Sequence, residues 1–210
     1  MKLFSYCIPV DNGAAPNPYW GICTLNICKP QIRKNAQVGD WIVGLGSRDV
    51  YGVDYSGKVV YAMNVMDKMT MAEYDQYCKK WLPEKIPDIR NTDYRRKVGD
   101  CIYDFDSDPE GKLRPSVHGL KNRNHDLNGK YTLLSEHFYY FGKNAIHLPP
   151  DLTVIIKQGP GQQSVANDPF KEEFIDWIEN LGYEVNLIHE NSQIRRDFGA
   201  SKRNKGCCNI

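Results

Sequence analysis

Three histidines in the second half of the chain are the side chains best suited to proton transfer. Histidine titrates near neutral pH, so His118, His125 and His137 are the candidate catalytic residues for acid–base chemistry. His118 and His125 lie in a polar stretch that we expect to form a flexible loop able to close over a ligand. A serine or cysteine beside one of them would complete a nucleophile pair, but the sequence does not show which residues come together. Whether the chain is an enzyme is therefore open.

Aromatic side chains point to a second kind of chemistry, the stacking of a base. Tyr19 and Trp20 stand in a Gly-, Pro- and Asn-rich segment at 11–28, and Trp41 opens the strand that follows. Stacking contributes ~1–3 kcal/mol per base, and an extruded base needs such a surface. The alternative is that Trp41 belongs to the core and that Trp20 covers one end of the fold. Tyr139 is a further aromatic candidate in the second half of the chain.

Polar and basic residues from both halves of the chain are candidates for reading a base edge and for holding phosphates. Asp11, Asn17 and Ser47 offer amide, carboxylate and hydroxyl groups for a base edge, although Asn and Asp also cap turns. The basic candidates for phosphate contacts are Lys29, Arg33, Lys34, Arg48, Lys121 and Arg123, unless they form a solvated face. The predicted ligand-binding set is Asn17, Tyr19, Trp20, Lys29, Arg33, Trp41, Ser47, Arg48 and Tyr139.

Neither a metal nor a cofactor is predicted. Cys23 and Cys28 are separated by four residues, whereas zinc sites use a closer first pair and need a second pair. His118 or His125 could complete such a set, but two small buried thiols explain the cysteines better. The chain has no P-loop and no glycine-rich dinucleotide fingerprint, since the GPGQQS segment lacks the required ending.

Composition and charge are those of an ordinary globular protein. The 210 residues are 41% hydrophobic and 25% charged, with a net charge of +1, so any nucleic-acid site must be local. No apolar run approaches the ~18 residues of a membrane span. Seven scattered cysteines and an N-terminus that reads as a strand favour reduced thiols and a cytoplasmic protein without a membrane partner. We predict one domain over residues 1–190 and a basic, flexible tail over 191–210.

The elements that must position these groups are short strands, two clear helices and long loops. Periodicity and turn signals predict strands at 3–10, 41–45, 58–65, 131–134, 152–157 and 183–188. Helices are predicted at 30–36, from Thr70 to Pro83, and from an Asp168 N-cap to Gly182. Residues 135–142 read as an aromatic turn or a single helical turn. The fold class is α+β, with a small mixed or barrel-like β core and peripheral helices, and loop 11–28 lying across the end of the sheet.

Two signatures in the chain resemble a known family. The first consists of Asp11, Gly13, Ala15-Pro16-Asn17-Pro18, Gly21, Cys23-Thr24-Leu25, Cys28-Lys29-Pro30, Ile32-Arg33 and Gly39-Asp40-Trp41, and the second is Ser135-Glu136-His137-Phe138-Tyr139-Tyr140-Phe141-Gly142. Together they resemble the second of the nucleotide modification associated domain families of bacteria and phages, over roughly residues 1–150. A weaker similarity, carried by a GD turn and two apolar strands, is to the PUA, EVE and YTH barrels, which bind nucleic acids.

The resemblance implies a biological setting without a reaction. That setting is DNA base modification and phage conflict, with a nucleic acid or nucleotide as the ligand and proteins of the same system as partners. The leading hypothesis is a binding module that recognises a modified base or nucleotide. The alternatives are an enzyme acting on a nucleobase, nucleotide or nucleoside, and an interaction subunit without a ligand.

Overall fold

The computed structural model describes residues 1–195, and these form a larger mixed sheet with layers packed on both of its faces. Within this range the larger sheet has the order β11-β1-β3-β4-β9-β12, and β10 also pairs with β4. Its strands are β1 (Leu3–Ile8), β3 (Trp41–Gly46), β4 (Lys58–Asn64), β9 (Phe138–Tyr140), β10 (Ile146–His147), β11 (Gln162–Gln163) and β12 (Leu187–Ile188). The predicted strands at 3–10, 41–45 and 58–65 are thus confirmed as neighbours in one sheet, and the α+β class is confirmed.

Smaller sheets and helices complete the described part of the chain. A three-stranded sheet contains β2 (Cys23–Leu25), β5 (Asp67–Thr70) and β8 (Tyr131–Ser135), and a hairpin contains β6 (Tyr103–Asp104) and β7 (Lys112–Leu113). The helices are α1 (Pro30–Asn35), α2 (Met71–Trp81), α3 (Tyr94–Lys97), α4 (Arg123–Leu127) and α5 (Lys171–Glu179). The 3₁₀ helices are η1 (Pro83–Lys85), η2 (Leu120–Asn122), η3 (Gly142–Asn144), η4 (Pro150–Ile155) and η5 (Val165–Phe170).

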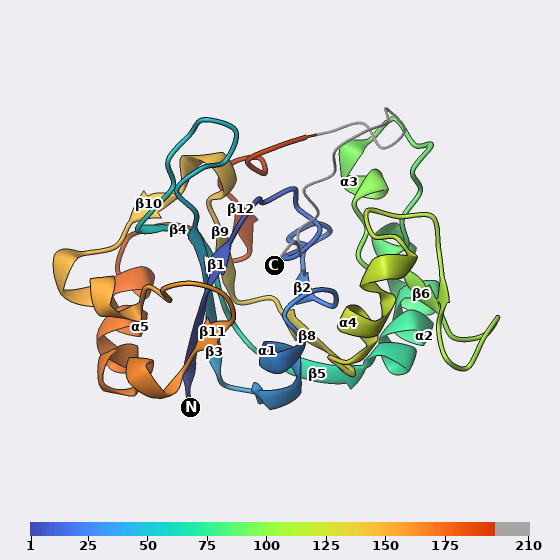
Figure 1. Cartoon of the computed structure of the whole chain (residues 1–210), viewed down its shortest axis with the longest axis horizontal. Helices are drawn as coiled ribbons and strands as arrows, with labels where there is room; N and C mark the ends of the chain where they lie inside the picture. The colour runs from blue at the N-terminus through green and yellow to red at the C-terminus, as the bar shows by residue number, and fades with distance from the viewer. Residues whose placement is uncertain (196–210) are drawn as a thin grey trace.

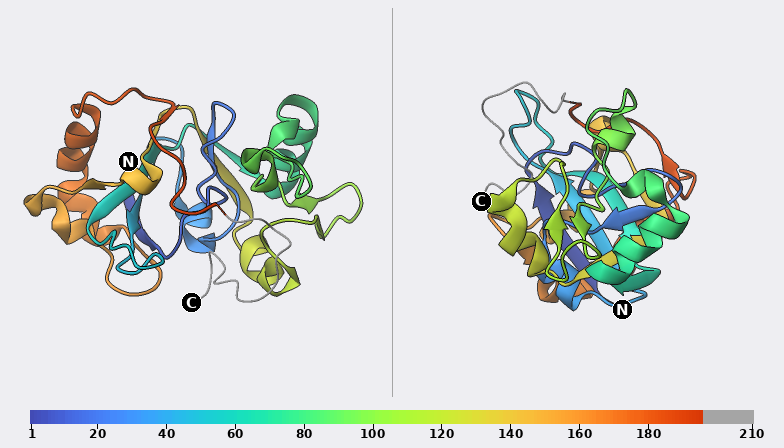
Figure 2. Two further views of the ribbon diagram at one scale, coloured as in Figure 1. Left: turned by 90° about the horizontal axis from the view of Figure 1, so that it is seen from above. Right: turned by 90° about the vertical axis from the view of Figure 1, so that its right-hand side faces the viewer.

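Alternation along β3 explains why both faces of the larger sheet are covered. Trp41, Val43 and Leu45 point into the cluster beneath α5, whereas Ile42 belongs to the cluster on the other face. Successive side chains of a strand leave opposite faces, so an unbroken apolar strand needs a layer on each side. Figure 1 shows α5 and η4 on one side of the sheet and α1, β8 and α2 on the other. The view from above in Figure 2 shows the same separation of α5 from α2.

Loop 11–28 packs over a face of the larger sheet instead of crossing its end. Ala14, Tyr19, Ile27 and Cys28 from this loop are buried in the same cluster as Tyr6 of β1. The loop contains the short strand β2, which pairs with β8. It is therefore part of the core, and the side chains that it carries are positioned by packing on both sides.

Several predicted elements are wrong. The predicted strand at 152–157 is the 3₁₀ helix η4, in which Leu152 and Ile155 bury one face at the threefold spacing of that helix. The turn expected at 135–142 contains β9, whose central residue Tyr139 faces α5. The last helix starts at Lys171, after η5, so Asp168 is not its N-cap. The last strand is confined to β12.

The first five residues of the predicted tail contact the body of the protein. The Ile194 amide donates to the Asp11 carbonyl at 3.1 Å, and the Asp11 amide donates to Oε1 of Gln193 at 3.1 Å. Ser192 is buried. The rest of the predicted tail lies outside the described residues.

Candidate functional site

Cys28 stands at a sharp turn of the backbone immediately before α1. Cys28 and Lys29 have φ values of 58° and 40°, and non-glycine residues adopt positive φ rarely and at a cost of about 1–3 kcal/mol each. Pro30 follows as the first residue of the helix, where its fixed φ is favourable. The Cys28 amide donates to Oδ1 of Asp126 at 2.9 Å, which helps to hold this conformation.

The Cys28 sulfur lies beside an imidazole that is itself paired with a carboxylate. Sγ of Cys28 is 3.6 Å from Nε2 of His118, and Nδ1 of His118 is 2.6 Å from Oδ2 of Asp126. Cys28 is 2% exposed, and the side chains of His118 and Asp126 are 1% and 0% exposed. The Cys28 sulfur, the imidazole and the carboxylate thus form one chain of polar contacts in a site closed to bulk water, which in the reduced protein would be the arrangement of a nucleophile, a general base and the group that orients the base.

The carboxylate of this chain is held in its charged form. Burial by itself would raise the pKa of Asp126, but the hydrogen bond and charge of His118, the Cys28 amide and the charge of Arg33 outweigh it and lower that pKa. Tyr103 also donates to Oδ2 of Asp126, at 3.0 Å. An ionised Asp126 fixes Nδ1 of His118 as the donor and leaves Nε2 to face the sulfur.

The Arg33 side chain connects the segment that contains Cys28 to the segment that contains Asp126. Its guanidinium is fully buried and donates to the carbonyls of Cys28 at 2.7 Å, of Tyr131 at 2.9 Å, and of Asp126. Burial lowers the pKa of Arg33 to about 10, so the group stays charged at neutral pH. A Cβ at Gly129 would fall 2.1 Å from the guanidinium carbon, so only glycine fits there. Arg33 therefore positions the backbone of both Cys28 and Asp126.

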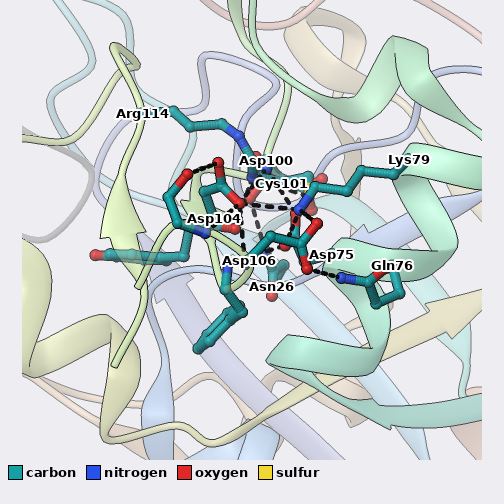
Figure 3. A network of polar contacts seen from close by, with 12 residues as sticks. Asn26, Asp75, Gln76, Lys79, Asp100, Cys101, Asp104, Asp106 and Arg114 are labelled. Atoms are coloured by element: carbon teal, nitrogen blue, oxygen red, sulfur yellow. Dashed lines mark hydrogen bonds and ion pairs between the residues drawn. The ribbon is translucent and has the colours of Figure 1, made fainter. Parts of the chain in front are cut away.

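The loop that carries His118 is anchored to α2 by a second polar network (Figure 3). Asp75 of α2 is buried and accepts from Arg114 at 2.7 Å and from Lys79 at 2.8 Å. Lys79 also pairs with Asp104 at 2.9 Å and with Asp106 at 2.6 Å. Since Arg114 precedes His118 by only four residues, this network fixes where the histidine enters the site.

The three donor groups do not fit a metal site as well as they fit a nucleophile site. One ligand atom each of Cys28, His118 and Asp126 lies within 4.8 Å of the others. Cys28 and Asp126, however, lie against opposite nitrogens of the His118 ring. A metal on either nitrogen would have two of these groups at most, whereas zinc sites use three or four protein ligands. The prediction of reduced thiols is wrong at Cys28, which is disulfide-bonded in the structure, so thiol chemistry at this position requires that the disulfide first be reduced.

Two cavities adjoin the site. One of about 500 Å³ is lined by Lys29, Pro30, Gln31, Ile32, His125, Gly161 and Gln162. The other, of about 510 Å³, lies beside the turn after β3 and includes Lys29, Ser47, Arg48 and Lys157. The structure therefore brings three members of the predicted ligand-binding set, Lys29, Ser47 and Arg48, together at the second cavity. His125 lines the first cavity together with Lys29.

Other members of the predicted ligand-binding set lie apart from these cavities. Trp41 and Tyr139 are buried under α5, on the face of the sheet opposite Cys28. Tyr19 is buried in the loop, and Trp20 is half-buried with the Arg95 guanidinium 4.5 Å above its ring. The structure does not assemble these aromatic rings around one cavity among the described residues.

The remaining histidine and basic candidates also occupy other surfaces. His137 lies below α5, with Nε2 3.3 Å from Oε1 of Glu179. Lys34 donates to the Asn128 side chain at 2.7 Å, Arg123 donates to the Glu110 carbonyl at 2.7 Å, and Lys121 is exposed. Of the three candidate histidines, His118 is the one that contacts a cysteine sulfur among residues 1–195.

Asn17 is fully buried in a network that satisfies it completely. Its amide donates to the carbonyls of Gly13 at 3.0 Å and Val98 at 2.9 Å, and its Oδ1 accepts from Nζ of Lys85 at 2.7 Å. Thr24 and Asp100 continue the network, joined at 2.6 Å. In this structure Asn17 fixes the loop and has no group directed at a ligand.

Asp11 is buried, and its titration gives a prediction about stability. Burial raises the pKa of Asp11 to about 6, against lowering hydrogen bonds from Tyr140 and the Gly13 amide. At a pH between these two values, the folded protein keeps the Asp11 proton, whereas the unfolded chain, in which the pKa is near 3.8, has lost it. Stability from this group therefore falls as pH rises through that window, by ~3 kcal/mol in total.

We expect the Asp11→Asn variant not to show this fall in stability as the pH rises. Asparagine keeps an acceptor for the Gly13 amide and can donate to the Tyr140 hydroxyl. Urea unfolding of both proteins at several pH values should show the stability of the variant, relative to wild type, rising between pH ~4 and ~7. A difference that does not change with pH would contradict the assignment.

The sequence offered only weak signals for the residues that complete the site. The cysteine spacing raises Cys28 only as a metal ligand or a small buried thiol, and no sequence pattern marks Asp126. A cysteine followed by Lys-Pro at a helix start was a visible signal, but nothing marked Asp126 among the many acidic residues of the chain. The pairing depends on α4 and α1 lying side by side, which Arg33 secures.

Comparisons with known proteins identify the family. No curated protein and no solved structure matches the chain. None of the helices in residues 1–195 is long and apolar enough to cross a membrane. The similarity to PUA, EVE and YTH domains finds no support. The family model described as nucleotide modification associated domain 2 matches residues 1–196, nearly the whole chain. The protein therefore belongs to the nucleotide modification associated domain 2 family.

Proposed function

We propose that the protein is an enzyme that uses the reduced Cys28 as a nucleophile in a nucleotide modification system. The observation that carries this proposal is the chain of contacts from Cys28 through His118 to Asp126. The family supplies the association with nucleotide modification. The substrate is a nucleotide or nucleic acid whose modified group carries an electrophilic carbon, and DNA modification or phage defence in the cytoplasm is the setting that we propose.

The chemistry divides between the three residues. Nε2 of His118 accepts the proton of the Cys28 thiol, and the negative charge of Asp126 stabilises the imidazolium that results. The thiolate then forms a bond to the electrophilic carbon, and the leaving group departs with its bonding electrons and takes the proton from His118. Water or an acceptor nucleophile subsequently gives its proton to His118, bonds to the same carbon and releases the Cys28 sulfur, which restores the starting state.

A binding module without catalysis is the second candidate. It is favoured by the cavity that gathers Lys29, Arg48 and Lys157, which would hold phosphates whether or not a reaction follows. The two candidates make different demands on Cys28, because only the enzyme needs a reactive thiolate.

The ionisation of Cys28 tests the enzymatic proposal. We expect the reduced protein to show a thiolate at neutral pH, with a pKa below the ~8.5 of an ordinary thiol, because His118 and Asp126 stabilise the ion pair. The measurement is the pH dependence of ultraviolet thiolate absorbance in the reduced wild type minus that of the reduced Cys28→Ser variant. A difference that titrates at or above ~8.5 would favour the binding module.

A further inference from the structure

The two cavities beside the site are joined through shared residues. Lys29 and Gly161 line both of them. Lys29 directly follows Cys28 in the chain, and His125 directly precedes Asp126. The joined cavities therefore lie next to the backbone of these two proposed catalytic residues. Any ligand held there would lie next to the site in which we place the nucleophile.

Three cations from separate segments converge on the larger of these cavities. Lys29 precedes α1, Arg48 follows β3 and Lys157 follows η4. The Lys29 ammonium is 3.3 Å from the Cys7 carbonyl and 4.8 Å from the centre of the Tyr6 ring, which places it at the wall formed by β1. Segments distant in the sequence thus bring like charges to one cavity, which is the arrangement that favours an anionic ligand.

No aspartate or glutamate is among the described residues that line either cavity. Asp54, whose pKa is lowered first by Ser56 and then by the charges of Arg48 and Lys58, does not line either cavity. The described residues of the walls therefore carry a net positive charge, in a protein whose net charge is only +1. A local field of this kind selects anionic ligands over neutral ones.

The opposite wall of the larger cavity is a glycine-rich loop. Gly159 and Gly161 have φ values of 71° and 93°, and no atom of the described residues beyond their chain neighbours lies within 4 Å of the position of a Cβ at either residue. Because glycine has no side chain, a ligand can approach this backbone more closely than it could approach another residue. Lys157 is positioned at the start of this loop.

We propose that the joined cavities bind the phosphate groups of the substrate, with Lys29, Arg48 and Lys157 as the phosphate contacts. This inference rests on the proposed function, because the phosphate groups assigned here belong to the same substrate whose electrophilic carbon would react with Cys28. The ligand chemistry is a phosphate monoester or diester, supplied by a free nucleotide or by a nucleic-acid strand.

The test uses a variant that leaves the nucleophile site intact. Arg48→Ala/Lys157→Ala removes two of the three cations, and Lys29 is kept because it adjoins Cys28. Lys112→Ala is the matched control, an exposed lysine on β7 away from both cavities. The probes are thymidine, thymidine 5′-monophosphate and a single-stranded oligothymidylate, titrated into reduced protein by calorimetry at two salt concentrations.

We expect wild type and Lys112→Ala to bind the phosphate-bearing probes and to bind thymidine much more weakly. The double variant should lose about tenfold in affinity for each phosphate contact removed. For the oligonucleotide, the slope of log affinity against log salt concentration should flatten by ~0.7 for each cation. Preference for the monophosphate over the strand would identify a free nucleotide as the substrate, and the reverse would identify a nucleic acid.

Equal binding by the double variant and the control would overturn this inference, as would equal affinity for thymidine and its monophosphate or the absence of any binding. The proposed function is tested separately, because the titration of the Cys28 thiolate needs no ligand. If phosphate binding depends on Arg48 and Lys157 while Cys28 titrates as an ordinary thiol, the cavity stands and the enzymatic proposal falls.

Discussion

The His118→Asn variant is expected to alkylate at Cys28 roughly 10- to 100-fold more slowly than wild type at about pH 6.5. An isolated thiol with a pKa near 8.5 is about 1% ionised at that pH, whereas a thiol paired with an imidazole has a pKa between about 3.5 and 7.5. The lower intrinsic nucleophilicity of a more acidic thiolate offsets only part of this difference. Asparagine keeps a polar side chain of similar reach but cannot accept and hold the proton.

The measurement is the rate of iodoacetamide modification across a range of pH, resolved by peptide mass spectrometry on reduced protein. Cys7 gives an internal control, because it is half-buried, its pKa is raised by burial, and it is not in contact with His118 in the structure. Its rate should be the same in both proteins. The Asp126→Asn variant should fall between wild type and His118→Asn, since it removes the charge that stabilises the imidazolium. Identical Cys28 profiles in all three proteins would refute the assignment.

The Lys85→Met variant is expected to lose ~3–5 kcal/mol of folding free energy. Nζ of Lys85 is fully buried and donates to the Asn17 carbonyl at 2.8 Å, the Ile22 carbonyl at 2.8 Å and Oγ1 of Thr24 at 3.0 Å, besides Oδ1 of Asn17. Methionine fills a similar volume but cannot donate to any of these acceptors, and the Asn17 carbonyl keeps its bond from the Thr24 amide. The substitution also removes the positive charge that offsets the buried Asp100 carboxyl, whose pKa is raised by burial.

Urea unfolding of the Lys85→Met variant against wild type tests this expectation, and Lys112→Met is the control at an exposed position. The control should stay within ~0.5 kcal/mol of wild type. If the Lys85→Met loss were under ~1 kcal/mol, the network would be dispensable and loop 11–28 would be held by apolar packing alone.

The first family signature contains polar residues that the structure buries. Asn17, Thr24 and Arg33 all lie within the first signature, and the structure gives each of them a buried partner. The sequence suggested ligand contacts for Asn17 and Arg33, because polar residues in a loop suggest a binding site. In the folded protein both side chains are buried and donate to backbone carbonyls, and Asn17 also accepts from Lys85.

The sequence by itself determined the elements whose signals are local. Apolar and aromatic runs bounded by turn signals predicted β1, β3, β4 and β8, and a capping box formed by Thr70 and Glu73 predicted the start of α2. Pro30 predicted the start of α1. These features depend on residues a few positions apart. The failures, at η4 and β9, were short apolar runs for which a strand, a turn and a 3₁₀ helix have similar patterns.

The site was decided only by tertiary structure, because its members are distant in sequence. Cys28 and His118 are separated by 90 positions, and their contact depends on the β6–β7 hairpin, the Asp75 network and the buried Arg33. No local pattern encodes that a cysteine before one short helix will meet a histidine before another. Packing also decided the faces of Trp41 and Tyr139, since a strand covered on both sides gives no periodicity that distinguishes a ligand face from the core.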